Sequence, residues 1–454
     1  MNKSYDLAII GSGPGGYVAG LYASRLGLKA CVIEKDLIGG TCLNWGCVPT
    51  KVMLHSAALL SQARGAASYG VICGRPAVDF PIIARRRDEV VTRLRTGIET
   101  LFRARGVDLI KGTARLKSPA TIDVAGEEIS AGHIIIATGS RPARIPGADY
   151  DEDSVCTSDG ILSIKELPKS IVIVGGGVIG CEFATLFNAF GCHVTIVEML
   201  DKLLATQSRE ASKKLETLLK KRGIDIYTSS KVESVVKSRP VTVKISGGKE
   251  IVADKVLVSV GRTAQTGGLG LEELGIKTGK GKIVVDGHLR TNAKNIYAIG
   301  DCVPGPLLAH KASYDGILAC DAIAGHPRKV DYSNIPNCIF TDPEIASVGM
   351  TEEEAKASHP DAKVAKFPYL GSGKAYLMGK TEGFLKIIGD SKGSILGIEI
   401  FGAEACGLIG EAVLAKTMGV NIKDLSYVVH GHPTLSEIFQ EAAHIFCGTG
   451  IHTA

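Results

Sequence analysis

The sequence has little aromatic character, and it lacks the short patterns that mark many metal sites. Phe, Trp and Tyr make up 5% of its 454 residues, and Trp45 is the only tryptophan, so tryptophan emission reports on one place in the chain. Neither a Cys-x-x-Cys nor a His-Glu-x-x-His pattern occurs. Because zinc sites are commonly recognised by such spacings, we predict no metal site.

Long apolar runs and blocks of basic residues are also missing. The stretch 171–181 is only about half of the roughly 20 residues that a membrane span needs, and four glycines interrupt it. The net charge of +5 is spread over the chain, and the basic run 85–87 is short enough to be a solvated helix face. We therefore predict neither a membrane nor a nucleic acid as a partner.

Few residues precede the first strand-like segment, 5–10, so the sequence predicts no signal or transit peptide and a cytoplasmic protein. Twelve cysteines would be mostly reduced in the cytoplasm, where a disulfide is more often catalytic than structural. The chain is also too long for one hydrophobic core, and we expect about three domains.

Two cysteines, Cys42 and Cys47, lie in the glycine-rich segment 39–51. Five helical steps rise about 7.5 Å, which exceeds the usual Cα separation of a disulfide, about 4.4 to 6.8 Å. The pair can therefore bond only if the chain bends, and Gly46 and Pro49 allow a bend. Two unrelated buried thiols are the alternative, but the glycines and the proline favour a redox-active pair.

A dinucleotide fingerprint follows the strand-like segment 5–10 and leads into a helix-like segment. Gly11 would make the tight turn, Gly13 would let the backbone approach a pyrophosphate, and Gly16 would let helix and strand pack. Glu34, at the end of the next strand, would accept a hydrogen bond from a ribose hydroxyl. The complete set predicts a dinucleotide site.

The same construction recurs after the strand-like segment 171–174, with Gly175, Gly177 and Gly180 in the turn and Glu198 at the matching acid position. A single glycine-rich turn can be purely structural, but two copies with equal spacing predict two nucleotide sites. Because the Glu198 carboxylate would repel a 2′-phosphate, we predict that the second site binds NAD and not NADP.

Three further apolar strands end in glycine or in Gly-Asp. Two of them end at Gly139 and Gly261, and the third ends at Gly300 and Asp301. Ligands of open α/β sheets bind outside the carboxyl ends of the strands, so we expect Asp301 to lie near a ligand.

Motifs in a fixed order connect these features to a known family: GSGPGG, GGTCLNWGCVPTK, ATGSRP, GGGVIGCE, SVGRT, YAIGDC, LLAHKA and HGHPTLSE. From end to end the chain resembles the flavin disulfide reductases, class I of the pyridine nucleotide-disulfide oxidoreductases, and among them the members that oxidise dihydrolipoamide. The resemblance implies an α/β fold with two Rossmann-like dinucleotide-binding domains, for FAD and NAD, and a C-terminal α+β dimerisation domain. The implied ranges are 1–147 for the FAD domain, 148–265 for the NAD domain, 266–334 for a central domain that completes the FAD site, and 335–454 for the dimerisation domain.

The resemblance also implies roles for single residues. The first turn and its acid would hold the adenylate end of FAD, the second turn and its acid would hold NAD together with Gly261, and Glu182 would pair with Lys51 beneath the flavin. Without the resemblance, Lys51 could equally be a solvated charge and His310 a satisfied polar group. The residues that would surround the flavin and ribityl are Lys51, Gly139, Asp301, Leu308, Ala309 and His310.

A homodimer is implied in which the C-terminal motif of one subunit faces the disulfide of the other. His432 would then be the acid/base and Glu437 its orienting partner, while we interpret His430 as structural. The segment 434–437 also fits a capping box, in which Glu437 would have a structural role and Thr434 would cap the next helix. The segment 313–315 departs from a commonly acidic stretch of the family.

The implied reaction is the oxidation of dihydrolipoamide at the Cys42–Cys47 disulfide, with electrons passing through FAD to NAD+. Cys42 would form the mixed disulfide and Cys47 would remain as a thiolate. The lipoyl group would come from a lipoylated carrier protein of a 2-oxoacid dehydrogenase or glycine cleavage complex.

The alternatives are a related FAD-dependent disulfide or metal-ion reductase and a non-catalytic scaffold subunit. A mercuric reductase-like enzyme would be expected to carry a C-terminal cysteine pair, but only Cys447 occurs there. Glu198 argues against a glutathione reductase-like use of NADPH. The presence of both Cys42 and Cys47 argues against a scaffold.

Overall fold

The computed structural model describes residues 3–452. Met1 and Asn2, on which the prediction about a signal peptide partly rests, lie outside the described residues. Within the described part of the chain, no helix combines the length and the apolar character needed to cross a bilayer.

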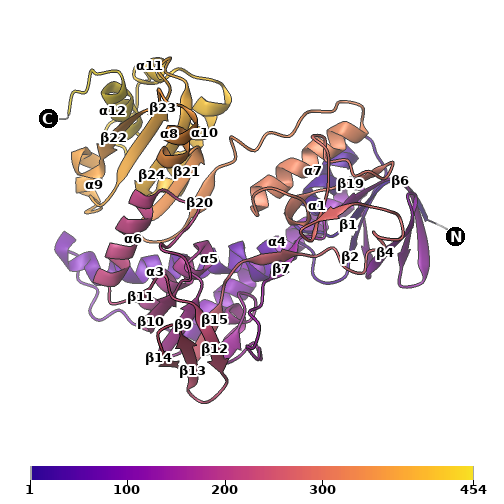
Figure 1. Ribbon diagram of the computed structural model, residues 1–454, viewed down its shortest axis with the longest axis horizontal. Helices are drawn as coiled ribbons and strands as arrows, with labels where there is room; N and C mark the ends of the chain where they lie inside the picture. The colour runs from indigo at the N-terminus through magenta and orange to yellow at the C-terminus, as the bar shows by residue number, and fades with distance from the viewer. Residues whose placement is uncertain (1–2, 453–454) are drawn as a thin grey trace. The chain divides into compact units, whose positions relative to one another are not determined.

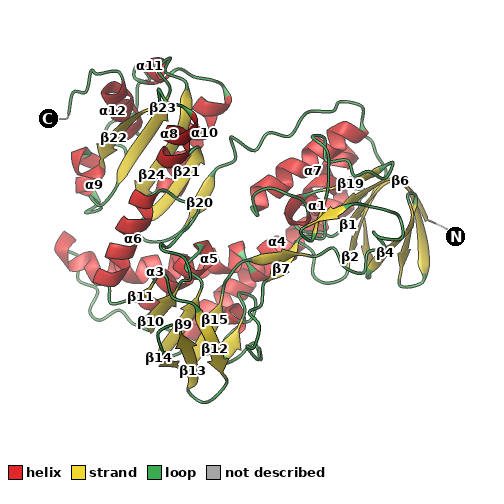
Figure 2. Cartoon of the chain, in the orientation of Figure 1, coloured by secondary structure: helices red, strands yellow, loops and turns green. Residues whose placement is uncertain are grey.

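The chain forms two compact units, which we describe separately and call the first and the second unit. The first comprises Met1–Leu167 and Val260–Tyr332, and the second comprises Pro168–Ser259 and Ser333–Ala454. Figure 1 follows the chain by residue number, and Figure 2 shows helices and strands in both units. Each unit is therefore built from two separate stretches of sequence.

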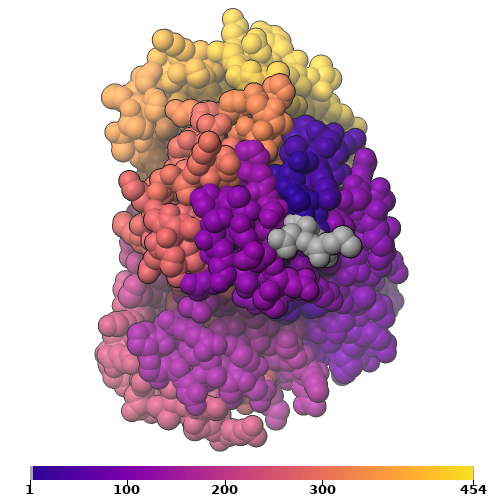
Figure 3. All heavy atoms as spheres, turned by 90° about the vertical axis from the view of Figure 1, so that its right-hand side faces the viewer, coloured from indigo at the N-terminus to yellow at the C-terminus, as the bar shows by residue number. Residues whose placement is uncertain are grey.

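The first unit is organised by a mixed sheet with the order β3-β2-β1-β6-β5-β4, in which β19 also pairs with β6. Leu7, Ala8 and Ile9 of the central strand β1 are fully buried, because helices cover parallel sheets on both faces. In Figure 3 the N-terminal segment, in indigo, lies beside purple residues, and β1 pairs with β6. The strands are β1 (Lys3–Ile10), β2 (Ala30–Glu34), β3 (Asp108–Lys111), β4 (Ala114–Ser118), β5 (Thr121–Val124), β6 (Glu127–Ile136) and β19 (Ile296–Ala298).

Small residues let the helices of the first unit pack closely. Gly15, Gly16, Ala19 and Gly20 of α1 are buried, and Gly15 lies against the backbone of Ala312 in α7. The helices are α1 (Pro14–Arg25), α2 (Gly40–Trp45), α3 (Cys47–Gly65), α4 (Phe80–Arg105) and α7 (Ala309–Ile323). The short elements are η1 (Ala66–Tyr69), β7 (Ser140–Pro142), β8 (Val155–Cys156), η2 (Ile161–Ser163), β16 (Arg262–Ala264), β17 (Thr278–Gly279), β18 (Lys282–Ile283) and η3 (Gly300–Cys302).

The first half of the second unit contains a parallel sheet, in which β11, β10, β9 and β15 are neighbours in this order. Parallel neighbours need a long crossover, and α5 supplies the one between β9 and β10. A three-stranded antiparallel sheet, β12-β13-β14, follows in the chain. The elements are β9 (Ser170–Val174), α5 (Val178–Ala189), β10 (His193–Val197), α6 (Arg209–Lys221), β11 (Asp225–Tyr227), β12 (Val232–Val236), β13 (Val241–Ile245), β14 (Lys249–Ala253) and β15 (Lys255–Val258).

The second half of this unit is an antiparallel sheet, β20-β21-β24-β23-β22, with helices packed on it, which is an α+β arrangement. Its core joins apolar side chains of β21, β23 and β24 to those of α10 and α12. The mixed sheet of the first unit, the parallel sheet of the second and this α+β part agree with the fold class predicted from the sequence. The elements are β20 (Asn337–Ile339), β21 (Glu344–Gly349), α8 (Glu352–Ser358), β22 (Lys363–Pro368), η4 (Tyr369–Gly371), α9 (Gly373–Leu377), β23 (Phe384–Gly389), β24 (Ile395–Gly402), α10 (Ala405–Thr417), α11 (Ile422–Leu425) and α12 (Glu437–Phe446).

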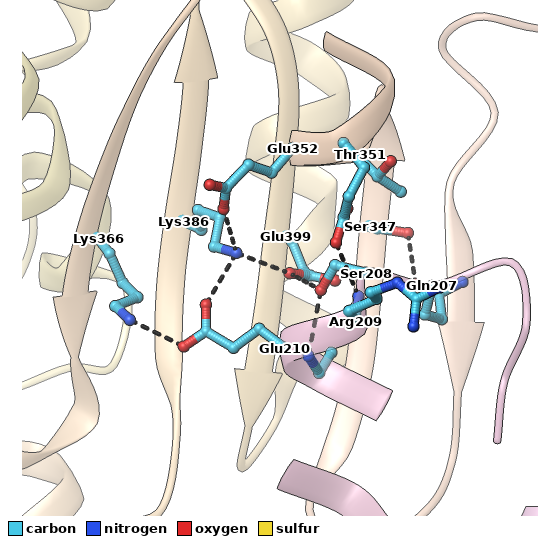
Figure 4. A network of polar contacts seen from close by, with 12 residues as sticks. Gln207, Ser208, Arg209, Glu210, Ser347, Thr351, Glu352, Lys366, Lys386 and Glu399 are labelled. Carbon is cyan, nitrogen blue, oxygen red and sulfur yellow. Dashed lines mark hydrogen bonds and ion pairs between the residues drawn. The ribbon is translucent and has the colours of Figure 1, made fainter. Parts of the chain in front are cut away.

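A buried charge cluster joins the two halves of the second unit (Figure 4). Lys386 on β23 is 1% exposed, and its Nζ lies 2.9 Å from carboxylate oxygens of both Glu210 and Glu352 and 3.7 Å from Glu399. The Ser208 hydroxyl donates to Glu399 at 2.8 Å. Burial alone would lower the pKa of Lys386, but the carboxylates outweigh it and raise that pKa, so the ammonium stays charged.

Candidate active site

The dithiol segment is bent at the predicted place. Helix α2 ends at Trp45 and α3 begins at Cys47, with Gly46 between them at φ −144° and ψ −113°. A Cβ added to Gly46 would lie 3.0 Å from the carbonyl oxygen of Thr41, so the position favours glycine. The break brings Cys42 and Cys47 together although they lie on separate helices.

Both cysteines are present as thiols, and their side chains are hydrogen-bonded to each other. This hydrogen bond and burial raise the pKa of Cys42, whereas the positive charge of Lys51 lowers it. Contact with Cys47 and burial therefore favour the protonated form of Cys42. The role of Cys47 as the thiolate stays a prediction.

The dithiol segment packs directly on the first dinucleotide turn. The Gly39 N–H donates to the carbonyl oxygen of Ser12 at 3.0 Å. Gly40 has φ +58°, and a Cβ there would lie only 2.7 Å from the Cα of Gly13, so the two backbones touch. The two sequence motifs therefore form one site within the first unit.

The first turn has the geometry that its pattern predicts. Gly11 has φ +101°, and a Cβ on Gly16 would collide with the Gly11 carbonyl oxygen at 1.8 Å. A Cβ on Gly13 would meet nothing within 4 Å, so this side of the turn is open to a ligand. The Tyr17 N–H donates to Gly13 at 2.9 Å as α1 begins. The backbone of the turn therefore requires glycine at positions 11 and 16, whereas Gly13 can face a pyrophosphate.

The second turn repeats this geometry. Gly175 has φ +105°, a Cβ on Gly180 would lie 1.9 Å from the Gly175 carbonyl oxygen, and Gly177 is open. The Cys181 N–H donates to Gly177 at 2.9 Å, as in the first turn. The second unit therefore carries a copy of the nucleotide turn of the first unit.

The two acids are held in the same way. Glu34 accepts from the Ser12 N–H at 2.9 Å and from the Asp36 N–H at 2.9 Å. Glu198 accepts from the Gly176 N–H at 2.6 Å and from the Leu200 N–H at 2.7 Å. Each carboxylate is fixed across its turn, and lone pairs remain to accept from a ribose hydroxyl.

The strand ends around Asp301 also converge. The Ser140 hydroxyl donates to Asp301 at 2.5 Å, and it accepts from Arg262 at 2.7 Å. The carbonyl of Gly139 accepts from the Gln265 N–H at 2.9 Å, and that of Gly261 accepts from the Ala143 N–H at 3.0 Å. Asp301 is thereby fixed at the end of the first unit's sheet, where the sequence places it.

A family model described as pyridine nucleotide-disulphide oxidoreductase matches residues 5–316, and its dimerisation domain matches 335–443. The chain belongs to the pyridine nucleotide-disulphide oxidoreductase family. The predicted resemblance is confirmed.

Relatives and solved structures cover the whole chain. A dihydrolipoyl dehydrogenase of Bacillus subtilis is 42% identical, with 100% of both chains covered. Leghemoglobin reductase of Glycine max is 40% identical over 96% of this chain and 87% of its own. The LpdA structure from Mycobacterium tuberculosis has a TM-score of 0.92 at 28% identity, with 98% and 99% covered. An HOCl-induced flavoprotein disulfide reductase of Escherichia coli has a TM-score of 0.88 at 30% identity, with 97% and 100% covered.

This oxidoreductase family uses FAD and NAD, which confirms the predicted cofactors. The open sides of Gly13 and Gly177 and the first turns of α1 and α5 fit such dinucleotides. Neither helix start is capped by a side chain, so backbone N–H groups there can receive a pyrophosphate. Within residues 3–452, no group of three or more His, Cys, Asp and Glu side chains could hold a metal ion.

His432 and Glu437 form the predicted pair in the second unit. The Nδ1 of His432 lies 2.8 Å from Glu437, and the His432 side chain is 78% exposed. Burial alone would raise the pKa of Glu437, but the hydrogen bonds from His432 and the Thr434 N–H outweigh it and lower that pKa. Glu437 therefore stays ionised, fixes the imidazole, and leaves its other nitrogen exposed.

The capping box is only half formed. Glu437 accepts from the Thr434 N–H at 2.8 Å, as the box requires. The Thr434 hydroxyl donates instead to the carbonyl oxygen of Gly431 at 2.7 Å, and Ser436 occupies the N-cap position of α12. The expectation that Thr434 caps this helix is wrong, because the helix begins later than the pattern suggests. Glu437 serves both the histidine and the backbone.

The remaining predicted residues lie in different places. Leu308 precedes α7 as its N-cap, Ala309 begins the helix, and His310 is exposed. Lys51 belongs to the first unit and Glu182 to the second, where the Glu182 carboxylate accepts from the Phe340 N–H at 3.0 Å. Their pairing stays a prediction.

The sequence analysis did not predict a buried ion pair that contacts Gly300, the residue before Asp301. Lys311 and Asp315 are 0% exposed and lie 2.7 Å apart. Asp315 also accepts from the Gly300 N–H at 2.9 Å and from the Tyr332 hydroxyl at 2.9 Å. The departure at 313–315 therefore retains one carboxylate, which holds Gly300 at the start of η3, next to Asp301. Lys311 belongs to the LLAHKA motif. The only sequence signal for its partner Asp315 is the spacing of four residues, which brings the two side chains to one face of a helix.

Proposed function

We propose that this enzyme oxidises dihydrolipoamide on a lipoylated carrier protein and reduces NAD+ to NADH. The observation that carries the proposal is the contact between the dithiol segment and the first dinucleotide turn, where Gly40 meets Gly13. This contact places a thiol pair next to the FAD fingerprint in one unit. Full-length dihydrolipoyl dehydrogenase relatives at about 40% identity support the choice of substrate.

We assign residues to this function as the sequence predicts. The domains are 1–147 for FAD, 148–265 for NAD, 266–334 for completing the FAD site and 335–454 for dimerisation, and the dimerisation-domain match that begins at 335 supports the last boundary. The two turns and their acids hold the dinucleotides, which the equal geometry of both copies supports. Lys51, Glu182 and the residues before and at the start of α7 complete the surroundings of the flavin.

Each thiol has a separate task. A substrate thiolate attacks Cys42, the Cys42–Cys47 bond breaks, and Cys47 leaves as a thiolate. The second substrate thiol then attacks the mixed disulfide, which releases the cyclic disulfide and returns Cys42 as a thiol. When bound, FAD supplies the two-electron carrier between this dithiol and NAD+. His432 of the partner subunit takes the substrate proton, and Glu437 stabilises the resulting imidazolium.

The chain carries a dimerisation domain, and a homodimer follows as part of the proposal. Apolar side chains are exposed in this domain: Leu414 is 64% exposed, Met418 is 71%, Tyr427 is 73% and Val429 is 89%. Such side chains are depleted on solvated surfaces, and a second copy would bury them. Val429 adjoins the histidine motif, so dimerisation would cover the surface beside His432.

The test combines activity and partner capture. Purified protein should be yellow and should form NADH from dihydrolipoamide and NAD+, with far less activity when glutathione replaces the dithiol or NADP+ replaces NAD+. Capture from a cytoplasmic extract should identify a lipoylated carrier of a 2-oxoacid dehydrogenase or glycine cleavage complex. A colourless protein, or one that reduces metal ions but not NAD+, would contradict the proposal.

A further inference from the structure

The C-terminal sheet of the second unit contains a cysteine pair that the reaction does not use. Cys338 lies on the edge strand β20, and Cys406 is the second residue of α10. Their side chains are hydrogen-bonded, and both are half-buried thiols. The two residues are distant in sequence, so the fold alone brings them together.

Neighbouring groups hold both thiols in place. The Cys406 Sγ lies 3.6 Å from the carbonyl oxygen of Ile339, the residue after Cys338, and 3.9 Å from that of Ile345 on the next strand. Cys338 pairs with Ala346 in the antiparallel ladder of β20 and β21. Strand register and the helix start therefore set the distance between the sulfurs.

A carboxylate completes the site. The Cys406 N–H donates to Glu344 at 2.9 Å, and the Cys406 thiol also contacts this carboxylate. The hydrogen bond with Cys338, burial and the negative charge of Glu344 all raise the pKa of Cys406. Because the thiolate is the reactive form, this pair should react more slowly than a thiol pair beside a cation.

We propose that Cys338 and Cys406 form a second disulfide, outside the catalytic cycle, when the protein meets an oxidant of the peroxide class. One thiolate attacks the peroxide, the O–O bond breaks, and a sulfenic acid and water form. The second thiolate attacks that sulfur, the S–O bond breaks, and the S–S bond forms as a second water leaves. Overall, two thiols lose two protons and two electrons, and hydrogen peroxide becomes two waters.

The new bond would tie the first strand of the C-terminal sheet to the helix that packs on it. Cross-links that close long loops stabilise a protein mainly by restricting its unfolded chain. We expect the oxidised second unit to melt about 5 °C or more above the reduced one. The pair would then act as a reversible reinforcement under oxidative conditions.

Tryptic peptides distinguish the two cysteine pairs. Cys338 lies alone in peptide 330–356 and Cys406 alone in peptide 393–416, whereas Cys42 and Cys47 share peptide 36–51. Reduced holoenzyme is treated with hydrogen peroxide, blocked with an alkylating reagent, digested and analysed by mass spectrometry. We expect peptides 330–356 and 393–416 to be linked to each other, at a dose above that which oxidises peptide 36–51.

The variants separate this proposal from general oxidation. Cys406→Ser should abolish the linked species and the oxidant-dependent rise in melting temperature, and the control Cys447→Ser, at an exposed cysteine of the same unit, should retain both. Glu344→Gln should speed formation of the link, because it removes a negative charge that adds to the hydrogen bond with Cys338 and to burial in raising the pKa of Cys406. The proposal fails if no link forms once peptide 36–51 is fully oxidised, or if Glu344→Gln slows the link while the variant remains folded. Neither readout depends on dihydrolipoamide turnover.

Discussion

In both cysteine pairs of this protein the two thiols are hydrogen-bonded to each other, but the charged neighbours of the pairs differ. Cys42 is hydrogen-bonded to Cys47 with Lys51 nearby, and Cys406 is hydrogen-bonded to Cys338 with Glu344 nearby. The hydrogen bond between the two thiols is the largest cause that raises the pKa of Cys42 in the first pair and of Cys406 in the second. The cation then opposes that effect in the first pair, and the carboxylate adds to it in the second.

The difference in charge shows that contact between two thiols does not by itself make them reactive. Two thiols in contact can form a disulfide wherever they lie, but exchange needs a thiolate. Lys51 stabilises that charge next to a dinucleotide turn, whereas Glu344 opposes it in a sheet remote in sequence from both turns. We therefore expect rapid cycling of the first pair and slow oxidation of the second.

The largest expected contrast is in turnover. Cys42→Ser should reduce dihydrolipoamide-dependent NADH formation to background, because the mixed disulfide can no longer form, while FAD stays bound. Cys406→Ser should retain the wild-type rate. Steady-state assays with matched flavin content measure both. The comparison would be wrong if the two variants lost activity to a similar extent.

The first cysteine pair could be predicted from the sequence and the second could not, for a physical reason. Cys42 and Cys47 share a segment with Gly46, so local bending alone joins them. Cys338 and Cys406 meet only through the register of β20 and β21 and the start of α10, which no local pattern encodes. The glycine turns were predictable because each needs glycine for steric reasons within a few residues. The ion pair behind Asp301 and the late start of α12 depend on tertiary packing.

The next contrast concerns the acid/base group that only the first pair requires. His432→Gln should slow the dithiol half-reaction by about 100- to 10,000-fold, the usual contribution of general acid/base catalysis. NADH oxidation by an artificial acceptor should change little, since no thiol proton is removed. Stopped-flow reduction of the flavin measures the first process.

His430→Gln is the matched control in the same motif. His430 lies 2.8 Å from Glu411, and this hydrogen bond, together with the charge of Glu411, outweighs burial and raises the pKa of His430. Its side chain is 6% exposed, so we expect a loss of stability and not a selective loss of the dithiol step. Equal selective losses in both histidine variants would show that His432 has no distinct catalytic role.

A smaller effect concerns the stability of the unit that holds the second pair. Lys386→Met should lower the free energy of unfolding by about 3 kcal/mol, because it leaves Glu399 buried without its cation. Lys366→Met is the control, since Lys366 contacts Glu210 from a half-exposed position, and it should cost less than about 1 kcal/mol. Chemical denaturation of the holoenzyme measures both.

The pH dependence of this charge cluster has a defined sign. Burial alone would raise the pKa of Glu210, but hydrogen bonds from Lys366 and Lys386 outweigh it and lower that pKa. Hydrogen bonds from Lys356 and Lys386 likewise lower the pKa of Glu352, so both pKa values lie below the ordinary 4.5. Carboxylates with a lowered pKa stabilise the fold above their unfolded values, and this stability is lost as the pH falls through the folded pKa. The gap between wild type and Lys386→Met should narrow below about pH 4.5. A constant gap across this range would show that the charges do not contribute.

The smallest expected effect tests the charge difference itself. Lys51→Met should raise the pKa of Cys42 further, because it removes the larger of the two causes that lower it and leaves the side-chain hydrogen bond with Cys47 and burial in place. A higher pKa lowers the thiolate fraction near neutral pH, so alkylation of the reduced pair should slow several-fold, and the pH at which alkylation accelerates should move upward. Lys117→Met, at an exposed lysine on β4 of the same unit, is the control and should leave both unchanged. Mass spectrometry of peptide 36–51 follows this reaction, and peptides 330–356 and 393–416 report the second pair in the same sample. If Lys51→Met left the alkylation of Cys42 and Cys47 as fast as in wild type, the neighbouring charge would not distinguish the two pairs, and the difference in their reactivity would have to come from solvent access alone.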